Sequence, residues 1–99
     1  MESTPTVAES ILLVNGYYAR VLFDPGATHS FISATFSDTL KNCPASPFGD
    51  ELLVRTPTGE SVRVVHAIPS IDVSVSGRCL KATVYILEMQ DFDVILGID

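Results

Sequence analysis

The chain has 99 residues, of which 46% are hydrophobic, and a formal net charge of -6 at pH 7. This length allows one small domain near the lower limit for a self-sufficient core, and the hydrophobic content excludes disorder of the whole chain. The acidic charge argues against a nucleic-acid-binding protein, which would carry a basic face. Its simpler role is to keep a small domain soluble. Association with a second copy is an ordinary way for so short a chain to bury more surface.

The sequence predicts no metal site. Its two cysteines, Cys43 and Cys79, form neither a disulfide framework nor a CxxC or Cys/His pattern. We expect them to be small buried thiols in a reducing compartment, and a single bridge between them stays open. No apolar run reaches the ~20 residues of a membrane span. The polar N-terminus, with Glu2 and Glu9, does not resemble a secretory signal. We therefore expect a cytosolic protein that binds no membrane.

Strand patterns dominate the first part of the chain. Residues 11–14 lead into Asn15-Gly16, a strong two-residue hairpin signal, and residues 17–23 return as a second strand. This strand stops at residues 24–26 (Asp-Pro-Gly), where proline fixes φ and glycine permits a positive φ. The sequence thus places an aspartate at the end of an apolar strand.

A short helix and further strands are expected in the rest of the chain. Ser33 can cap a helix over residues 34–40, and residues 42–50, with two prolines and a glycine, resemble a loop. The later strands are predicted at residues 52–54, 62–68, 71–75, 80–87 and 93–97. Six or seven short strands with one or two short helices indicate an all-β fold that closes into a small barrel. Residues 1–99 are expected to form one domain, with residues 1–9 as a flexible N-terminal extension.

The segment around Asp24 is the candidate for chemistry. Asp-Pro-Gly by itself is first of all a good β-turn. Here, however, Asp24 follows the apolar residues 21–23 and precedes the small residues Gly26, Ala27 and Thr28, which let one backbone approach another. A second apolar segment that ends in glycine, residues 94–97, comes near the end of the chain. This context favours a functional aspartate.

At this point the sequence resembles the proteases of Ty3/gypsy-type LTR retrotransposons, particularly those of plants. Three segments carry the resemblance in the right order: residues 21–33 around Asp24, residues 56–59 (Thr-Pro-Thr-Gly) and residues 91–99. The resemblance implies a retropepsin-type barrel that is one lobe of a two-fold homodimer, acting in the cytoplasm or within virus-like particles. It also implies a flap formed by Pro57, Thr58 and Gly59, and a closing apolar-glycine motif formed by Ile95, Leu96 and Gly97. Relatives usually continue with Trp-Leu after the residue matching Asp99, so we expect a C-terminus truncated from a longer polyprotein.

The resemblance also implies the reaction. Two carboxylates that share one proton hold a water between them; one takes the proton of the water while the other polarises the scissile carbonyl. This chain offers one suitable residue, so a symmetric dimer would bring Asp24 and its copy together. The Gly26 amide would help to fix the carboxylate. An extended peptide from a Gag-Pol-type polyprotein would bind largely through its backbone, and no cofactor is required.

Pro25 departs from the resemblance. The family usually has Ser or Thr there, whose hydroxyl and amide hydrogen-bond across the two-fold axis, and proline supplies neither donor. Two alternatives therefore stay open beside an active protease. One is a retropepsin-like domain that no longer cleaves and serves as a dimerisation or peptide-binding module. The other is an unrelated ligand-binding β-barrel in which Asp24 merely belongs to a turn.

Four further residues near these motifs have plainer interpretations. His29 is expected to pack or to hydrogen-bond, because the aspartic mechanism needs no imidazole. Thr28 either hydrogen-bonds within the loop or occupies a tight site. Asp91 and Asp93 adjoin the closing strand, and we expect both of them to be solvated.

Overall fold

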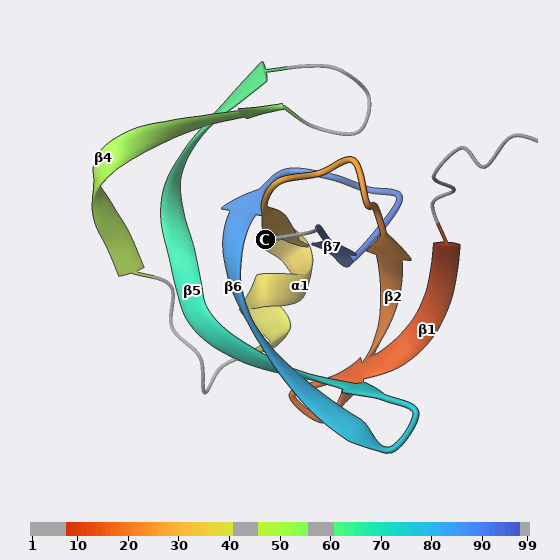
Figure 1. The fold of residues 1–99 in the computed structure, drawn as a ribbon. Coiled ribbons are helices and arrows are strands. Elements are labelled where there is room, and N and C mark those ends of the chain that lie inside the picture. Colours follow the sequence, from red (N-terminus) through yellow and green to blue (C-terminus); the bar gives the residue numbers. More distant parts are fainter. Residues whose placement is uncertain (1–7, 41–45, 56–60, 98–99) are drawn as a thin grey trace, which may run out of the picture.

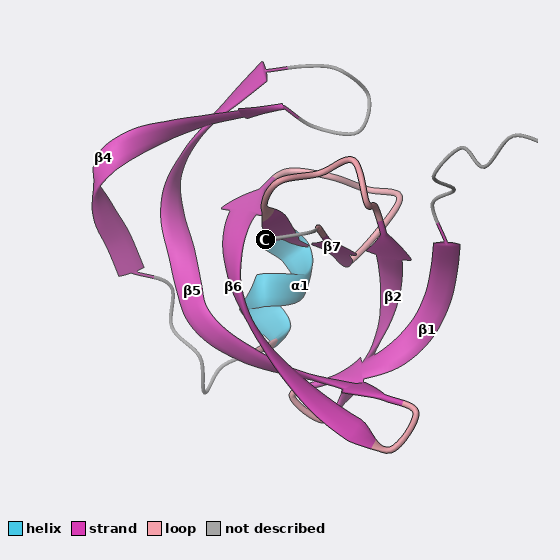
Figure 2. Ribbon diagram, in the orientation of Figure 1, coloured by secondary structure: helices cyan, strands magenta, loops and turns pink. Residues whose placement is uncertain are grey.

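The structure, a computed structural model, describes residues 8–40, 46–55 and 61–97. Seven strands and one short helix form in these ranges (Figures 1 and 2). In chain order they are β1 (Ala8–Val14), β2 (Tyr17–Phe23), β3 (Ser30–Ser33), α1 (Ala34–Thr39), β4 (Ser46–Arg55), β5 (Ser61–Val75), β6 (Arg78–Leu87) and β7 (Val94–Leu96).

Six of the strands close into a barrel. Their order is β1-β2-β7-β3-β6-β5, and β5 pairs again with β1 to complete the ring seen in Figure 1. The closing contact is short, with Leu13 opposite Ser74 and Val14 opposite Val73. β4 pairs with β5 alone and so extends the sheet outside the ring. The predicted small closed all-β barrel is confirmed.

The last strand, β7, lies between two early ones. β7 runs parallel to β2, with Val94 opposite Val21 and Leu96 opposite Phe23. On its other edge β7 is antiparallel to β3, with Ile95 opposite Phe31. The loop that joins β2 to β3 must therefore pass over the end of β7. This loop carries Asp24, so the fold brings the two predicted motifs together.

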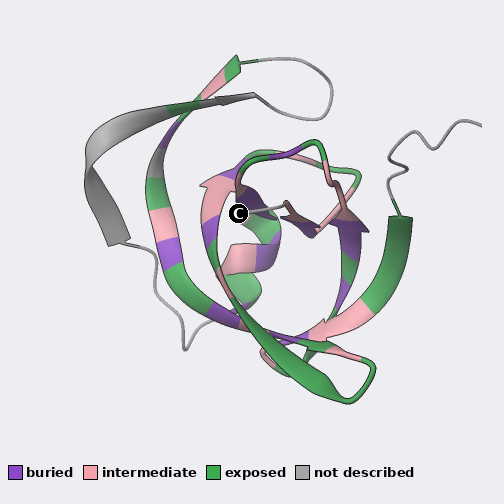
Figure 3. Ribbon diagram, viewed as in Figure 1, coloured by how far each residue is buried: buried purple, intermediate pink, exposed green. Residues whose placement is uncertain are grey.

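The barrel interior holds the larger of two apolar clusters. Its buried members come from every strand of the ring and from α1, and the buried positions are seen along the strands in Figure 3. Phe36 contributes from the helix and Leu40 from the residue that follows it, and Ser33 caps the helix by accepting a hydrogen bond from the Phe36 N–H at 2.9 Å. The remaining buried residues of this cluster are Val14, Ala19, Val21, Ile32, Ile68, Ile71, Val73, Val84 and Val94.

None of the described residues forms a helix with the length and apolar character that a membrane span requires.

The first hairpin forms as predicted and also helps to close the barrel. Asn15 and Gly16 both have positive φ, 50° and 86°, as a two-residue turn of this kind requires. The Asn15 N–H donates to the Asp72 carbonyl at 2.8 Å, and the Asp72 N–H donates to Asn15 Oδ1 at 2.7 Å. These two bonds continue the β1–β5 contact beyond the last paired residues. The asparagine therefore serves both the turn and the closure.

Asp72 also carries an ion pair on the surface. The Lys81 ammonium donates to Asp72 Oδ1 at 2.7 Å, and this hydrogen bond, together with the charge of Lys81, lowers the pKa of Asp72. A lowered pKa means that the stabilisation is present above the ordinary value of 3.8 and is lost as the pH falls through the folded value. Both side chains are about half exposed or more, so solvent and salt weaken the pair.

Several boundaries differ from the sequence prediction. Ser30–Ser33 forms strand β3, which was not predicted, and residues 46–50 of the expected loop belong to β4. The two strands expected at 62–68 and 71–75 are one strand, β5, with a register shift between Ile68 and Ile71. Ala8 and Glu9 of the expected N-terminal extension belong to β1, in which Glu9 pairs with Leu22. Residues 1–7 lie outside the described residues.

Two side chains also differ from their predicted environments. Cys79 is an exposed free thiol, because it lies in the outward-facing start of β6 beside the β5–β6 turn. Cys43 lies outside the described residues. Asp93 is half-buried, and its Oδ2 accepts a hydrogen bond from the Arg20 N–H at 2.8 Å. It therefore keeps part of its expected solvation, although β7 places it against the middle of β2.

Substitution of Asn15 separates its two roles. We expect Asn15→Gly to lower the free energy of unfolding by about 1 kcal/mol, because glycine accepts the positive φ but the Asp72 N–H loses its partner. Asn15→Ala should lower it by about 1 kcal/mol more, because alanine is also strained in the left-handed backbone conformation. Urea unfolding at pH 7 measures both differences. Equal midpoints for the parent and both variants would contradict this role.

Candidate active site

Asp24 lies immediately after β2, at the start of the loop that passes over β7. Its backbone N–H donates to the Leu96 carbonyl at 2.9 Å, which continues the β2–β7 pairing by one residue. Its own carbonyl accepts from the Ala27 N–H at 3.0 Å and closes a tight turn. The aspartate is therefore held by the backbone on both sides, and the residue is half-buried.

The carboxylate of Asp24 is oriented by the turn itself. The Gly26 N–H donates to Asp24 Oδ1 at 3.0 Å. Such a bond from a backbone amide stabilises the charged form and fixes the rotamer of the side chain. Pro25, between the two residues, has no N–H to contribute. The geometry at Gly26 is the one that the family resemblance implied.

Gly97 packs directly against the backbone of the same loop. A β-carbon at this position would lie 2.5 Å from the His29 carbonyl oxygen and 2.6 Å from that of Ala27. No side chain fits at such distances, so glycine is required by the close approach of two backbone segments. The Gly97 N–H donates to Ser30 Oγ at 3.1 Å. Of the predicted closing motif, Leu96 and Gly97 thus contact the Asp24 loop directly.

Thr28 and His29 form the far side of the loop. Thr28 Oγ1 and His29 Nδ1 are 2.9 Å apart, a hydrogen bond within the loop. The imidazole also packs edge-on against Tyr85, with the ring centroids 5.5 Å apart. The predicted packing and hydrogen-bonding role of His29 is confirmed. Of the two roles predicted for Thr28, the hydrogen bond within the loop is the one observed.

The carboxylate of Asp24 lies beside a cluster of buried apolar side chains. Alternation along β2 puts Leu22 on the same face as Asp24. Ile95 is opposite Leu22 on one side and Phe31 on the other, so the third predicted member of the closing motif belongs to this face. These three side chains form the second apolar cluster, together with Val64 and Leu87 and, partly buried, Val62, Tyr85, Met89 and Phe92. Since Val62 and Val64 come from β5, the first residues of β5 pack against this cluster.

The predicted flap lies outside the described residues. Its residues Pro57, Thr58 and Gly59 fall between the described residues Arg55 and Ser61. The strands on either side are described: Arg55 is opposite Ser61, and Leu52 is opposite Val64. The predicted hairpin around the flap sequence is therefore present up to its tip.

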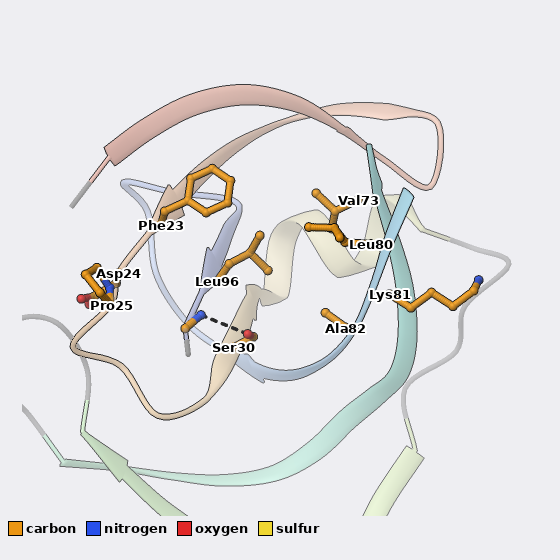
Figure 4. Close-up of a pocket in the computed structure, with 10 residues that line it drawn as sticks. Phe23, Asp24, Pro25, Ser30, Val73, Leu80, Lys81, Ala82 and Leu96 are labelled. Atoms are coloured by element: carbon orange, nitrogen blue, oxygen red, sulfur yellow. Dashed lines mark hydrogen bonds between the residues drawn. The ribbon is translucent and has the colours of Figure 1, made fainter. Parts of the chain in front are cut away.

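A cavity of about 520 Å³ opens on the opposite face of the same strands. Figure 4 shows Phe23, Leu96 and Ala82 around it, with Asp24 and Pro25 at one margin. Phe23 alternates with Asp24 along the chain, so the cavity lies on the barrel side of β2, and the exposed residues Leu80 and Lys81 place its mouth at the surface. Ser30 is one of its polar lining residues, together with Asp24 and Lys81.

Sequence reasoning missed two residues that hold the site. Ser30 is buried and bonds Gly97, although the sequence offered only a serine between His29 and an apolar pair as a signal. Asp93 joins three elements: beside its side-chain bond to Arg20, its N–H donates to the Arg20 carbonyl and its carbonyl accepts from the Ser33 N–H. A local pattern does not reveal such partners, which are distant in the sequence.

The arrangement can supply one fixed carboxylate per chain. Among the described residues, no group of three or more His, Cys, Asp or Glu side chains could hold a metal ion. A carboxylate whose position is set by backbone bonds can accept a proton from a water or hydrogen-bond a carbonyl. Chemistry that needs two carboxylates would require a second Asp24.

Gly97→Ala tests the close approach beneath the loop. The added methyl group would overlap the Ala27 and His29 carbonyls, so we expect the free energy of unfolding to fall by about 2 kcal/mol or more. Gly26→Ala is the matched control, since its β-carbon would meet only Asp24 Oδ1, at 3.4 Å, and should cost much less. Thermal and urea unfolding give the comparison. An equal loss for the two variants would contradict the assignment.

The chain was compared with known proteins. The family model for retroviral aspartyl proteases matches residues 1–99. Among solved structures, EIAV protease in complex with the inhibitor HBY-793 has a TM-score of 0.69 and 19% identity, covering 98% of this chain and 86% of that one. The retroviral protease-like domain of Ddi1 from Leishmania major has a TM-score of 0.63 and 18% identity, covering 100% and 73%. No curated protein matches the chain.

The two structural likenesses support the fold, and the family match covers the whole chain, including the loop of Asp24 and the glycine beneath it. The chain belongs to the retroviral aspartyl protease family.

Proposed function

We propose that this chain is one subunit of a homodimeric aspartic endopeptidase, with Asp24 of each subunit as the catalytic carboxylate. The observation that carries the proposal is the geometry at Asp24: its N–H is bonded to Leu96 and its carboxylate to the Gly26 amide. Family membership supports the same residue as the acid–base group. A half-buried aspartate with its orientation fixed in advance suits a reaction in which protons move over short distances.

The reaction follows from two such carboxylates on a two-fold axis. At ~3 Å apart they cannot both ionise, so the pair shares one proton and titrates as a unit. The ionised member takes a proton from a water held between them while the protonated member polarises the scissile carbonyl. The water oxygen attacks the carbonyl carbon, and the resulting tetrahedral diol breaks down as the amide nitrogen receives a proton.

The substrate is proposed to be an extended peptide. It would lie beside Asp24, over the apolar cluster of Leu22, Phe31 and Ile95, whose buried side chains would support the binding site from beneath, and the hairpin of β4 and β5 would cover it. Backbone hydrogen bonds would provide most of the affinity, as in an added β-strand. We propose a Gag-Pol-type polyprotein of a Ty3/gypsy-type retrotransposon in the cytosol, on the strength of the motifs in residues 21–33, 56–59 and 91–99.

A second candidate is a dimerisation or peptide-binding module without activity. Pro25 favours it, because proline offers neither a hydroxyl nor an N–H to a neighbouring subunit. Asp24 would then remain as part of the turn. The two candidates share the fold and the peptide site, and they differ in whether Asp24 is needed for anything beyond structure.

Asp24→Asn distinguishes the two candidates. We expect the parent to cleave an unfolded protein substrate between about pH 4 and 7 with a bell-shaped profile, because one carboxyl of the pair must be ionised and the other protonated. The asparagine side chain keeps the shape of the aspartate and an oxygen for the Gly26 N–H but cannot exchange the proton, so cleavage should fall by at least about a thousand-fold. Cleavage that is equal in parent and variant would exclude the aspartic mechanism.

Pro25→Thr tests the effect of the proline on association. If threonine restores two hydrogen bonds on each side of the axis, at ~1 kcal/mol net per bond, the dimer dissociation constant should fall by at least about ten-fold. Sedimentation across a range of concentrations measures it, with Thr28→Ser as a control outside the proposed contact. A constant that is unchanged or higher in Pro25→Thr would show that residue 25 does not limit association.

A further inference from the structure

One peptide group beneath the active-site loop is held at both ends. The Leu96 carbonyl accepts from the Asp24 N–H at 2.9 Å, and the Gly97 N–H donates to Ser30 Oγ at 3.1 Å. The carbonyl of Leu96 and the N–H of Gly97 belong to the same planar unit, so neither can turn without the other. A hydrogen bond at one end therefore fixes the direction of the bond at the other.

Ser30 is well placed to fix this peptide. The residue is 3% exposed. It is the first residue of β3 and lies opposite Val84 of β6. Figure 4 shows its hydroxyl directed at the Gly97 nitrogen, at the wall of the cavity. The hydroxyl thus extends from a strand that is paired on both edges, β6 on one side and β7 on the other. It is a rigid support for the peptide.

We propose that Ser30 is a positioning residue for Asp24, acting through the Leu96–Gly97 peptide. The proposal rests on the proposed catalytic function of Asp24 and adds a residue that the mechanism itself does not use. Ser30 directs the Leu96 carbonyl at the Asp24 N–H, and the Asp24 turn with its Gly26 contact is built on that bond. The serine does not contact the carboxylate.

Removing the hydroxyl would free the peptide to tilt. The cavity beside Ser30, Leu96 and Gly97 gives it space, since about 520 Å³ lies open there. A tilt toward the cavity would draw the Leu96 carbonyl away from Asp24 and weaken the first bond of the turn. Because small displacements of a catalytic group have large effects on rate, the carboxylate would be less well placed for reaction. The apolar cluster beneath the proposed peptide site lies on the other face and would be little affected.

Ser30→Thr and Ser30→Val form the test pair. Their side chains have the same shape and differ in whether a hydroxyl or a methyl group faces Gly97, and the cavity accommodates the added methyl of either. Ser33→Ala is the matched control. Ser33 is also a buried serine, 2% exposed, that accepts one backbone N–H, but it does so at the cap of α1. Ser30→Ala replaces the valine variant if valine does not fold.

In peptide cleavage, Ser30→Val should lower kcat by about ten-fold or more with KM within about two-fold of the parent, whereas Ser30→Thr should retain kcat. Ser33→Ala should lower the melting temperature without lowering kcat. If Ser30 only stabilised the fold, kcat would not differ in this way between the valine and threonine variants. Equal kcat in the threonine and valine variants, or the same loss of kcat in Ser33→Ala, would overturn the proposal.

Amide hydrogen exchange gives a readout that does not require activity. The Gly26 and Ala27 N–H groups bond to Asp24. We expect their exchange to accelerate about ten-fold in Ser30→Val relative to Ser30→Thr, with Ser33→Ala unchanged at these two amides. If the parent does not cleave but this difference is seen, positioning by Ser30 stands and the proposed function fails. If the parent cleaves but the amides exchange alike in both variants, the function stands and the positioning role is wrong.

Discussion

Two backbone segments approach each other at Gly97 so closely that a β-carbon there would lie within 2.6 Å of two carbonyl oxygens. The rest of the site depends on this approach. It lets the loop of residues 24–29 lie directly on the end of β7, so that Leu96 can accept the Asp24 N–H and Ser30 can accept the Gly97 N–H. These contacts join the start of the chain to its end. They depend on the pairing of β7 between β2 and β3, so the loop of Asp24 is held by contacts between residues far apart in the sequence.

Alternation along β2 places its side chains on two faces with different roles. Phe23 turns toward the barrel interior, whereas Leu22 and Asp24 turn to the surface on which Ile95 and Phe31 also lie. Packing inside the ring keeps the strands in place, and the outer apolar cluster supports the proposed peptide site next to the carboxylate. The same register, Leu22 opposite Ile95 opposite Phe31, determines both. A shift by one residue would exchange the faces of Phe23 and Asp24, so the packing of the barrel and the side on which the carboxylate lies are specified together.

The sequence was informative wherever local chemistry decides the structure. Asn15-Gly16 predicted its hairpin because few residue pairs accept two positive φ angles, and Asp24-Pro25-Gly26 predicted a turn after an apolar strand. The sequence did not predict the features that depend on partners distant in the chain. β3 is four residues long and exists because β6 and β7 pair with it on both edges. Ser30 and Asp93 looked ordinary, since their partners, Gly97 and Arg20, are 67 and 73 residues away. The catalytic candidate could thus be found from sequence, but not the residues that hold it.

The hydrogen bonds of the described loop show what Pro25 can and cannot change. The donors that shape it are the N–H groups of Asp24, Gly26, Ala27 and Gly97. None of these bonds uses the N–H of residue 25, and the fixed φ of proline reduces the freedom of the turn before it forms. A proline here therefore leaves the position of the carboxylate within one subunit intact. What it removes is a pair of donors that the loop could offer to a second subunit. Pro25 therefore bears on the contact between two copies that the proposed function requires, rather than on the placement of Asp24 within one chain.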